Sequence, residues 1–159
     1  MHLTNQCLQV DGDMYAAFEE GNTLTYKDLQ TYLDKKFPSR KLKLDEFFIP
    51  RVKDLILDAC LSNKRTMNPC GKTNVFELLG FDFLIDEDFR TWLIEVNTNP
   101  YLGTPNEAMQ LLVPQMVNDV LKIVVDPVMP PTTVPMNLGS NGFELLYQDA
   151  SARHGNAVN

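Results

Sequence analysis

The strongest constraint on the fold is a pair of segments with alternating side chains, residues 75–86 and 91–97, separated by the polar connection 87–90. A period of two is the pattern of a β-strand, and a short polar connection typically joins antiparallel neighbours. The sequence therefore predicts a β-hairpin. The side chains expected on its apolar face are Phe81, Phe83, Trp92, Ile94 and Val96.

This hairpin predicts which polar side chains face one another. If the connection is residues 87–90, counting back along both strands places Asp82 opposite Glu95, with Asn97 further along the same face. Any connection with an even number of residues keeps the three side chains together. An odd number would separate Asp82 from the other two, because side chains alternate between the faces of a strand.

Two carboxylates that oppose each other across a sheet repel and destabilise it. A cation between Asp82 and Glu95 would convert this repulsion into binding, and hard oxygen ligands suit Mg²⁺. Asn97 would add a neutral carbonyl oxygen. The alternative is an ordinary solvated face of a two-sided hairpin. Spacing alone leaves both interpretations open.

Three helices are expected around the hairpin, which makes the fold class α+β. The first covers residues 25–36 and begins with a sequence that resembles a capping box. The second runs from 45 to about 62, and Pro50 is tolerable there only in the first turn. In the third, apolar residues recur as far as Val124, and Pro114 either starts the helix or kinks it.

Bulk properties restrict the class of protein. The 159 residues suit a single core. A net charge of −7 argues against nucleic acid as the main partner. We expect no membrane association, since no apolar run approaches a membrane span and no signal peptide is visible. The three cysteines form no C-x-x-C pair, which favours reduced thiols in the cytoplasm.

The chain is expected to divide near residue 130. Residues 1–130 would form the domain, and 131–159 a partly disordered tail in which Phe143 to Tyr147 could form one more strand. The basic stretch Arg40 to Lys43 is interpreted as a solvated connector, because charge runs usually face water.

A family resemblance is carried by the hairpin and by a segment ahead of it. The chain resembles the end of the catalytic domain of the tubulin–tyrosine ligase family over residues 1 to about 130. The Glu-x-Asn-x-x-Pro element alone would indicate only the broader ATP-grasp class. The matching segments are Phe76 to Asp86, Trp92 to Pro100, and His2-Leu3-Thr4-Asn5.

The resemblance implies the C-terminal part of an ATP-grasp domain, an antiparallel sheet packed with helices. Its members activate a carboxylate as an acylphosphate with ATP and Mg²⁺, and an amino acid amine then attacks to modify tubulin. By this resemblance Asp82, Glu95 and Asn97 match the Mg²⁺ ligands, and Thr4 and Asn5 match residues at the nucleotide. The implied partners are tubulin or microtubules and a free amino acid. The implied location is the cytoplasm and cytoskeleton, with the cilium or flagellum as one possible site.

Departures from the family pattern leave alternatives open. The family's catalytic domain is longer, and the part expected upstream of His2 carries the lysines that grip the ATP phosphates. We therefore expect the isolated chain to be inactive. Residues 110–114 lack the lysine of glutamate-adding members, which weakens a glutamylase interpretation. The alternatives are a non-catalytic module or pseudoenzyme that binds tubulin or another partner, and a metal-binding hairpin unrelated to ATP. For the basic stretch, the alternative is contact with an acidic tubulin tail.

Overall fold

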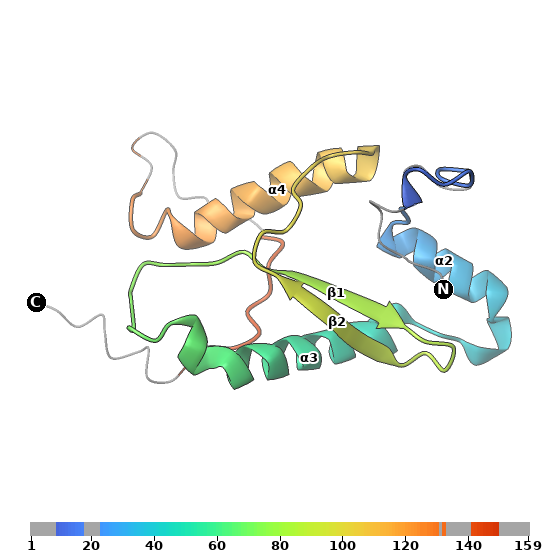
Figure 1. Ribbon diagram of the computed structural model, residues 1–159, viewed down its shortest axis with the longest axis horizontal. Helices are drawn as coiled ribbons and strands as arrows, with labels where there is room; N and C mark the ends of the chain where they lie inside the picture. Colours follow the sequence, from blue (N-terminus) through green and yellow to red (C-terminus); the bar gives the residue numbers. More distant parts are fainter. Residues whose placement is uncertain (1–8, 18–22, 131, 133–140, 150–159) are drawn as a thin grey trace, which may run out of the picture. The chain divides into compact units, whose positions relative to one another are not determined.

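The computed structural model describes residues 9–17, 23–130, 132 and 141–149. Within them, helices and one antiparallel sheet confirm the α+β class (Figure 1). None of the described helices is long and apolar enough to cross a membrane. The elements are α2 (Tyr26–Lys36), the 3₁₀ helix η2 (Pro38–Arg40), α3 (Leu44–Met67), β1 (Gly80–Ile85), β2 (Thr91–Asn97) and α4 (Glu107–Val124).

The chain forms two compact units. The first contains residues 1–47 and 102–115, and the second contains 48–101 and 116–159. The expected division of the chain near residue 130 into a domain and a tail stays a prediction.

In the first unit, α2 begins with the capping box expected from the sequence. The backbone N–H of Asp28 donates to Thr25 Oγ1 at 3.2 Å, and the N–H of Thr25 donates to Asp28 Oδ2 at 3.2 Å. These bonds satisfy donors that a helix start leaves unpaired. Leu33 and Leu44 are the buried apolar side chains of the described residues, and Leu44 is fully buried.

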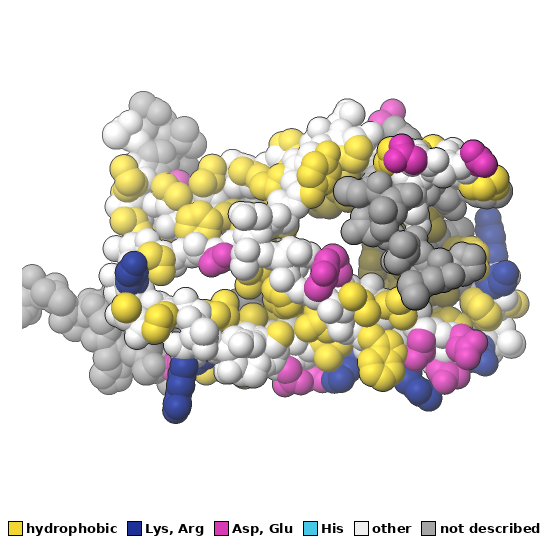
Figure 2. All heavy atoms as spheres, viewed as in Figure 1, with side chains coloured by type: hydrophobic (Ala, Val, Ile, Leu, Met, Phe, Trp, Pro, Cys, Tyr) yellow, Lys and Arg dark blue, Asp and Glu magenta, His cyan; other side chains and the backbone are white. Residues whose placement is uncertain are grey.

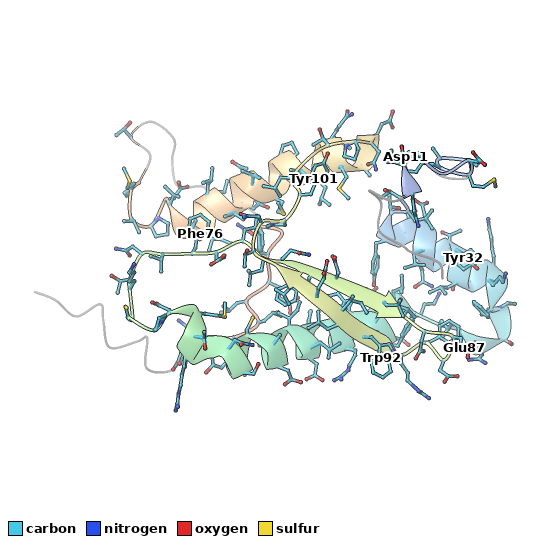
Figure 3. All side chains as sticks on the ribbon, in the orientation of Figure 1. Asp11, Tyr32, Phe76, Glu87, Trp92 and Tyr101 are labelled. Carbon is cyan, nitrogen blue, oxygen red and sulfur yellow. The ribbon has the colours of Figure 1, made fainter. Side chains whose placement is uncertain are left out.

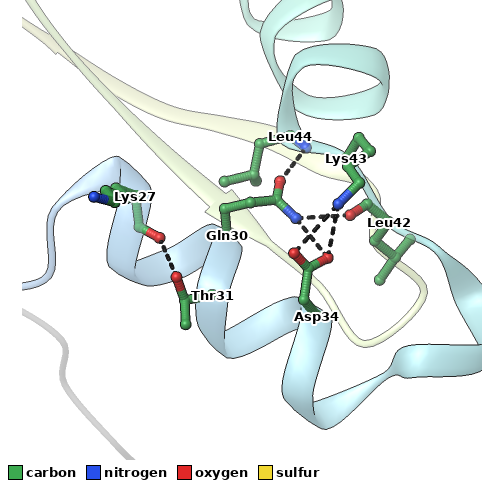
Figure 4. A network of polar contacts seen from close by, with 7 residues as sticks. All are labelled: Lys27, Gln30, Thr31, Asp34, Leu42, Lys43 and Leu44. Atoms are coloured by element: carbon green, nitrogen blue, oxygen red, sulfur yellow. Dashed lines mark hydrogen bonds and ion pairs between the residues drawn. The ribbon is translucent and has the colours of Figure 1, made fainter.

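A polar network connects α2 to the start of α3 (Figure 4). The Gln30 side chain donates to the carbonyl of Leu42 and accepts from the N–H of Leu44, both at 2.9 Å. Lys43 Nζ lies 3.0 Å from Asp34 Oδ1. One glutamine side chain thus bonds to the backbone on both sides of Lys43 and holds the turn that leads into α3.

Both long helices contain proline beyond their first turn. The helix expected to start at residue 45 and to end near 62 spans Leu44–Met67, and Pro50 lies inside it. The expectation that this proline is tolerable only in the first turn is therefore wrong. The proline removes the hydrogen bond to the carbonyl of Glu46, and the turns on either side retain theirs. α4 starts at Glu107, capped by Asn106, whose Oδ1 accepts from the N–H of Met109 at 3.0 Å. Pro114 therefore lies inside α4 and does not start it.

In the second unit, one face of the hairpin packs on α3. The rings of Phe83 and Phe48 meet edge to face with centroids 6.4 Å apart, and Phe81 stacks beside Phe83 at 6.4 Å. These contacts fix the inner face of β1, and Asp82 lies on the opposite face of the hairpin.

Residues 141–149 contain no strand, so the extra strand expected at 143–147 is wrong. Side-chain contacts hold the segment instead. Asp119 of α4, only 1% exposed, accepts from the N–H of Gly142 at 3.0 Å through Oδ2. Ion pairs join Lys53 to Glu144 and Lys64 to Asp149.

Candidate functional site

The hairpin brings the two expected carboxylates together. Asp82 pairs with Glu95 across the antiparallel strands, and Gly80 pairs with Asn97. Paired residues share a face of the sheet, so Asp82, Glu95 and Asn97 all lie on one face. The expected register at this point is confirmed.

The route to this register differs from the expected one. Ile85, not Asp86, pairs with Thr91, so the connection comprises residues 86–90 and has an odd number of residues. A β-bulge follows: Asp82 pairs with Glu95 and Phe83 with Leu93, which leaves Ile94 as the extra residue of β2. The odd connection and the bulge each shift the register by one residue, and the two shifts cancel before Glu95.

The bulge also redistributes the apolar side chains. Leu93 and Thr91 lie on the packed side with Phe83, and Thr91 is only 8% exposed. Trp92 is 51% exposed and Ile94 60% exposed, so their expected place on the apolar face is wrong. Figure 3 labels Trp92 beside the loop end of the hairpin, near Glu87.

The three polar side chains form a contact group. Asn97 Nδ2 lies 3.4 Å from Asp82 Oδ2 and 3.3 Å from Glu95 Oε1. Partial burial and the neighbouring Glu95 carboxyl raise the pKa of Asp82 above its usual range, against a smaller lowering by Asn97. The fold therefore holds Asp82 and Glu95 in contact despite the repulsion between their carboxylates.

The donor set fits a hard divalent cation. Asp82 and Glu95 supply carboxylate oxygens, and turning over the amide of Asn97 would present its oxygen in place of its nitrogen. Among the described residues no cluster of three or more His, Cys, Asp or Glu side chains forms a metal site. Two carboxylates and one amide leave several positions of an octahedral Mg²⁺ for water and phosphate oxygens. A cation there would offset the repulsion that raises the pKa of Asp82.

Asp86 organises the connection, a role that the sequence analysis did not identify. Its Oδ1 accepts from the N–H groups of Asp88 at 2.9 Å and Arg90 at 2.8 Å, and its Oδ2 accepts from Trp92 Nε1 at 2.9 Å. The bond from Trp92, followed by those from the backbone, lowers the pKa of Asp86. The available signal was an aspartate at the start of a turn, where its side chain commonly accepts from backbone N–H groups.

The other expected site residues, Thr4 and Asn5, lie outside the described residues. Cys60 of α3 is half-buried. It lines a cavity of 460 Å³ between α3 and the base of the hairpin, together with Phe81 and Val96. The wall of this cavity formed by the hairpin belongs to the packed face of the sheet, opposite the Asp82–Glu95 pair.

Comparison with known proteins identifies related sequences. Residues 1–133 match the sequence profile of the tubulin-tyrosine ligase family. Protein polyglycylase TTLL10 of Mus musculus is 34% identical over 128 residues, which cover 79% of this chain and 18% of that protein. Tubulin glycylase 3A of Drosophila melanogaster is 32% identical over 151 residues, covering 93% of this chain and 14% of that protein.

A third relative, from Homo sapiens, is named inactive polyglycylase TTLL10. It is 33% identical over 128 residues, which cover 79% of this chain and 19% of that protein. The chain thus spans less than a fifth of the length of each of these three relatives.

Proposed function

Because the chain belongs to the tubulin-tyrosine ligase family, we propose that it contributes the metal-binding hairpin of an ATP- and Mg²⁺-dependent ligase that modifies tubulin. The observation that carries this proposal is the pairing of Asp82 with Glu95 beside Asn97. The α+β architecture is compatible with the C-terminal part of an ATP-grasp domain.

Asp82 and Glu95 would hold the metal through carboxylate oxygens, and Asn97 through its amide oxygen. Bound Mg²⁺ supplies positive charge that neutralises phosphate oxygens during phosphoryl transfer. Thr4 and Asn5 are proposed to contact the nucleotide. The protein needs no covalent nucleophile of its own, because positioning and charge neutralisation supply the catalysis.

The proposed reaction has two steps, each balanced. A carboxylate of the substrate protein takes the terminal phosphoryl group of ATP, which forms an acylphosphate and releases ADP. The amine of the incoming amino acid then attacks the acyl carbon, releases phosphate and forms an amide. We propose glycine as that amino acid, because the three relatives described above are named glycylases or polyglycylases. Tubulin as substrate would place the protein at the cytoskeleton.

The test is incorporation of radiolabelled glycine into tubulin by the complete gene product that contains this chain, with ATP and Mg²⁺. Asp82→Asn and Glu95→Gln are expected to reduce incorporation by about a hundredfold or more, the scale of losing an electrostatic group in a preorganised site. Titration calorimetry with Mg²⁺, in the presence and absence of ATP, measures the metal role separately. We expect Mg²⁺ to bind tightly only with nucleotide present.

Asp88→Asn is the matched control, because Asp88 is an exposed carboxylate of the same hairpin whose ion pair is with Arg90. It should retain both activity and Mg²⁺ binding. Full activity in the Asp82 and Glu95 variants would refute the metal role. Retained Mg²⁺–ATP binding without glycine transfer would favour a non-catalytic module, and the human relative carries the name inactive.

A further inference from the structure

Residues 141–149 are attached to α4 at Asp119. This aspartate is 1% exposed, and its Oδ2 accepts from the N–H of Gly142 at 3.0 Å. The segment is otherwise joined to α3 by the two ion pairs described above. Figure 2 shows charged side chains of both signs along the lower edge of the view, where Figure 1 places α3. Ion pairs open to solvent stabilise little, so the contact with Asp119 is the stronger attachment.

The attached segment begins with Asn141 and Gly142, the one Asn-Gly pair of the sequence. In such a pair the backbone nitrogen of the glycine can attack the side-chain amide carbon of the asparagine and close a succinimide ring. The two groups are neighbours in the chain, and no Cβ crowds the glycine nitrogen. Asn141 is half-buried and Gly142 is exposed, so water reaches the pair.

Hydrogen bonds engage each of the reacting groups. The attacking nitrogen, that of Gly142, donates its proton toward the Asp119 carboxylate. The carbonyl under attack, Oδ1 of Asn141, accepts from the N–H of Phe143 at 2.8 Å, a donor placed where negative charge would develop. The leaving nitrogen, Nδ2 of Asn141, donates to the backbone carbonyl of Asp119 at 3.0 Å. The fold thus orients nucleophile, electrophile and leaving group together.

Asp119 has the properties of a general base for this reaction. Its Oδ1 lies 3.7 Å from Lys122 Nζ, and the opposite charge favours the ionised carboxylate. Its Oδ2 already accepts the hydrogen bond from the N–H that must lose its proton. A base within hydrogen-bond reach of the proton meets the geometric requirement for general-base catalysis.

We propose that Asn141 and Gly142 form a self-modifying site, at which Asn141 deamidates with Asp119 as the general base. The Gly142 nitrogen bonds to Cγ of Asn141, and its proton passes to Asp119. The bond from Cγ to Nδ2 then breaks, and ammonia leaves with a proton that Asp119 returns through water. A water molecule then adds to one carbonyl carbon of the succinimide and opens the ring to aspartate or isoaspartate.

The product weakens the attachment of residues 141–149. A carboxylate at position 141 replaces the amide N–H that donates to the carbonyl of Asp119, so that one acceptor faces another. It also places a second negative charge beside the buried carboxylate of Asp119. Deamidation therefore loosens this segment from α4, as a slow and irreversible switch that does not depend on the proposed ligase activity.

The test incubates the complete gene product that contains this chain at neutral pH. Peptide mapping by mass spectrometry follows deamidation of Asn141, with isoaspartate resolved by chromatography. We expect the folded protein to deamidate Asn141 about tenfold or more faster than a synthetic peptide of residues 139–147, because only the fold supplies the base. Asn74, an exposed asparagine followed by valine, is the internal control and should stay unmodified. An equal or slower rate in the folded protein would overturn the proposal.

Variants separate the base from the fold. Asp119→Asn retains an acceptor for the Gly142 N–H but no base, so the rate should fall to that of the peptide. Gly142→Ala should also slow the reaction, and its Cβ would meet Asp119 Oδ2 at 3.5 Å, an ordinary contact that should leave the melting temperature unchanged. Glu144→Gln removes an exposed carboxylate of the same segment and should leave the rate unchanged. The parent rate in Asp119→Asn would refute the role of Asp119 as the base.

Asn141→Asp reproduces one product and tests its effect on the segment. Hydrogen exchange at the N–H groups of Gly142 and Phe143 should be faster in this variant than in the parent, because their acceptors move away as the attachment loosens. Aged parent protein should show the same change in proportion to its deamidated fraction. Exchange as slow as in the fresh parent would overturn the release of the segment.

Discussion

Two aspartates in one hairpin have pKa values displaced in opposite directions. Partial burial and Glu95 raise the pKa of Asp82, whereas the indole N–H of Trp92 and backbone N–H groups lower that of Asp86. The surroundings of Asp82 therefore disfavour its charged form, whereas the hydrogen-bond donors around Asp86 favour its charged form. This contrast agrees with the proposed metal-binding role of Asp82 and the structural role of Asp86 in the connection.

The contrast predicts opposite effects on stability. A raised pKa means that the contribution of Asp82 is present below the pKa of the unfolded state and is lost as the pH rises through that of the folded state. Asp82→Asn should therefore raise the free energy of unfolding near neutral pH, and the gain should vanish in acid. Urea denaturation at neutral and acidic pH measures this difference.

Asp86→Asn should show the reverse. Because its pKa is lowered, Asp86 stabilises the protein above the unfolded-state pKa, and this contribution is lost as the pH falls through the folded-state value. The variant should be less stable than the parent near neutral pH and should converge with it in acid. Destabilisation by both substitutions at neutral pH would contradict the conclusion that the surroundings of Asp82 disfavour its charged form.

At this scale the sequence predicted the Asp82–Glu95 pair but misplaced Trp92 and Ile94. The alternating pattern indicates a strand, and alternation cannot reveal a bulge because an extra residue leaves no compositional signature. The apolar side chains of Trp92 and Ile94 fitted the expected alternation, so they did not indicate the bulge. Asp82 still pairs with Glu95 because the one-residue shift caused by the bulge cancels the one caused by the odd connection.

Among the elements, α3 contains the most direct opportunity for stabilisation. Pro50 lies inside the helix and removes one backbone hydrogen bond. Pro50→Ala should raise the free energy of unfolding by about 1–3 kcal/mol, measured by urea denaturation, because proline is the least favourable residue of a helix interior. An unchanged or lower stability would mean that the surrounding packing requires the bend.

The start of α2 offers a matched pair of threonines. Thr25→Ala removes the capping hydroxyl and should lower the free energy of unfolding by about 1 kcal/mol. Thr31 lies inside the same helix and its hydroxyl donates to the carbonyl of Lys27, so Thr31→Ala should be neutral or slightly stabilising. Equal losses of stability in the two variants, by thermal or urea denaturation, would show that the cap contributes nothing specific.

The elements were predicted unequally well for a physical reason. α2 has a capping box and an apolar stripe, which are local signals, and its bounds were nearly correct. The end of α3 was placed too early, since its last turns lack strong apolar periodicity but continue as helix to Met67. The strand expected at 143–147 failed because a strand needs a partner, and ion pairs and Asp119 hold this segment instead.

For the molecule as a whole, Asp119 is the buried residue that attaches residues 141–149. Asp119→Ala should lower the free energy of unfolding by about 1–3 kcal/mol, because the Gly142 N–H loses its acceptor. Hydrogen exchange at Gly142 should also accelerate. Glu144→Gln tests an exposed ion pair of the same segment and should change stability by about 1 kcal/mol or less. Comparable effects of the two substitutions would contradict the role of Asp119 as the anchor.

Because Ile94 is the extra residue of the bulge, β2 contains one residue more than regular pairing with β1 requires. Deleting Ile94 would leave a continuous ladder in which Phe83 still faces Leu93 and Asp82 still faces Glu95. Homologous chains can therefore differ by one residue between Asp82 and Glu95 without moving either carboxylate to the other face. The spacing between the two acids is then not a reliable signature, and alignments of related proteins should be anchored separately at each strand.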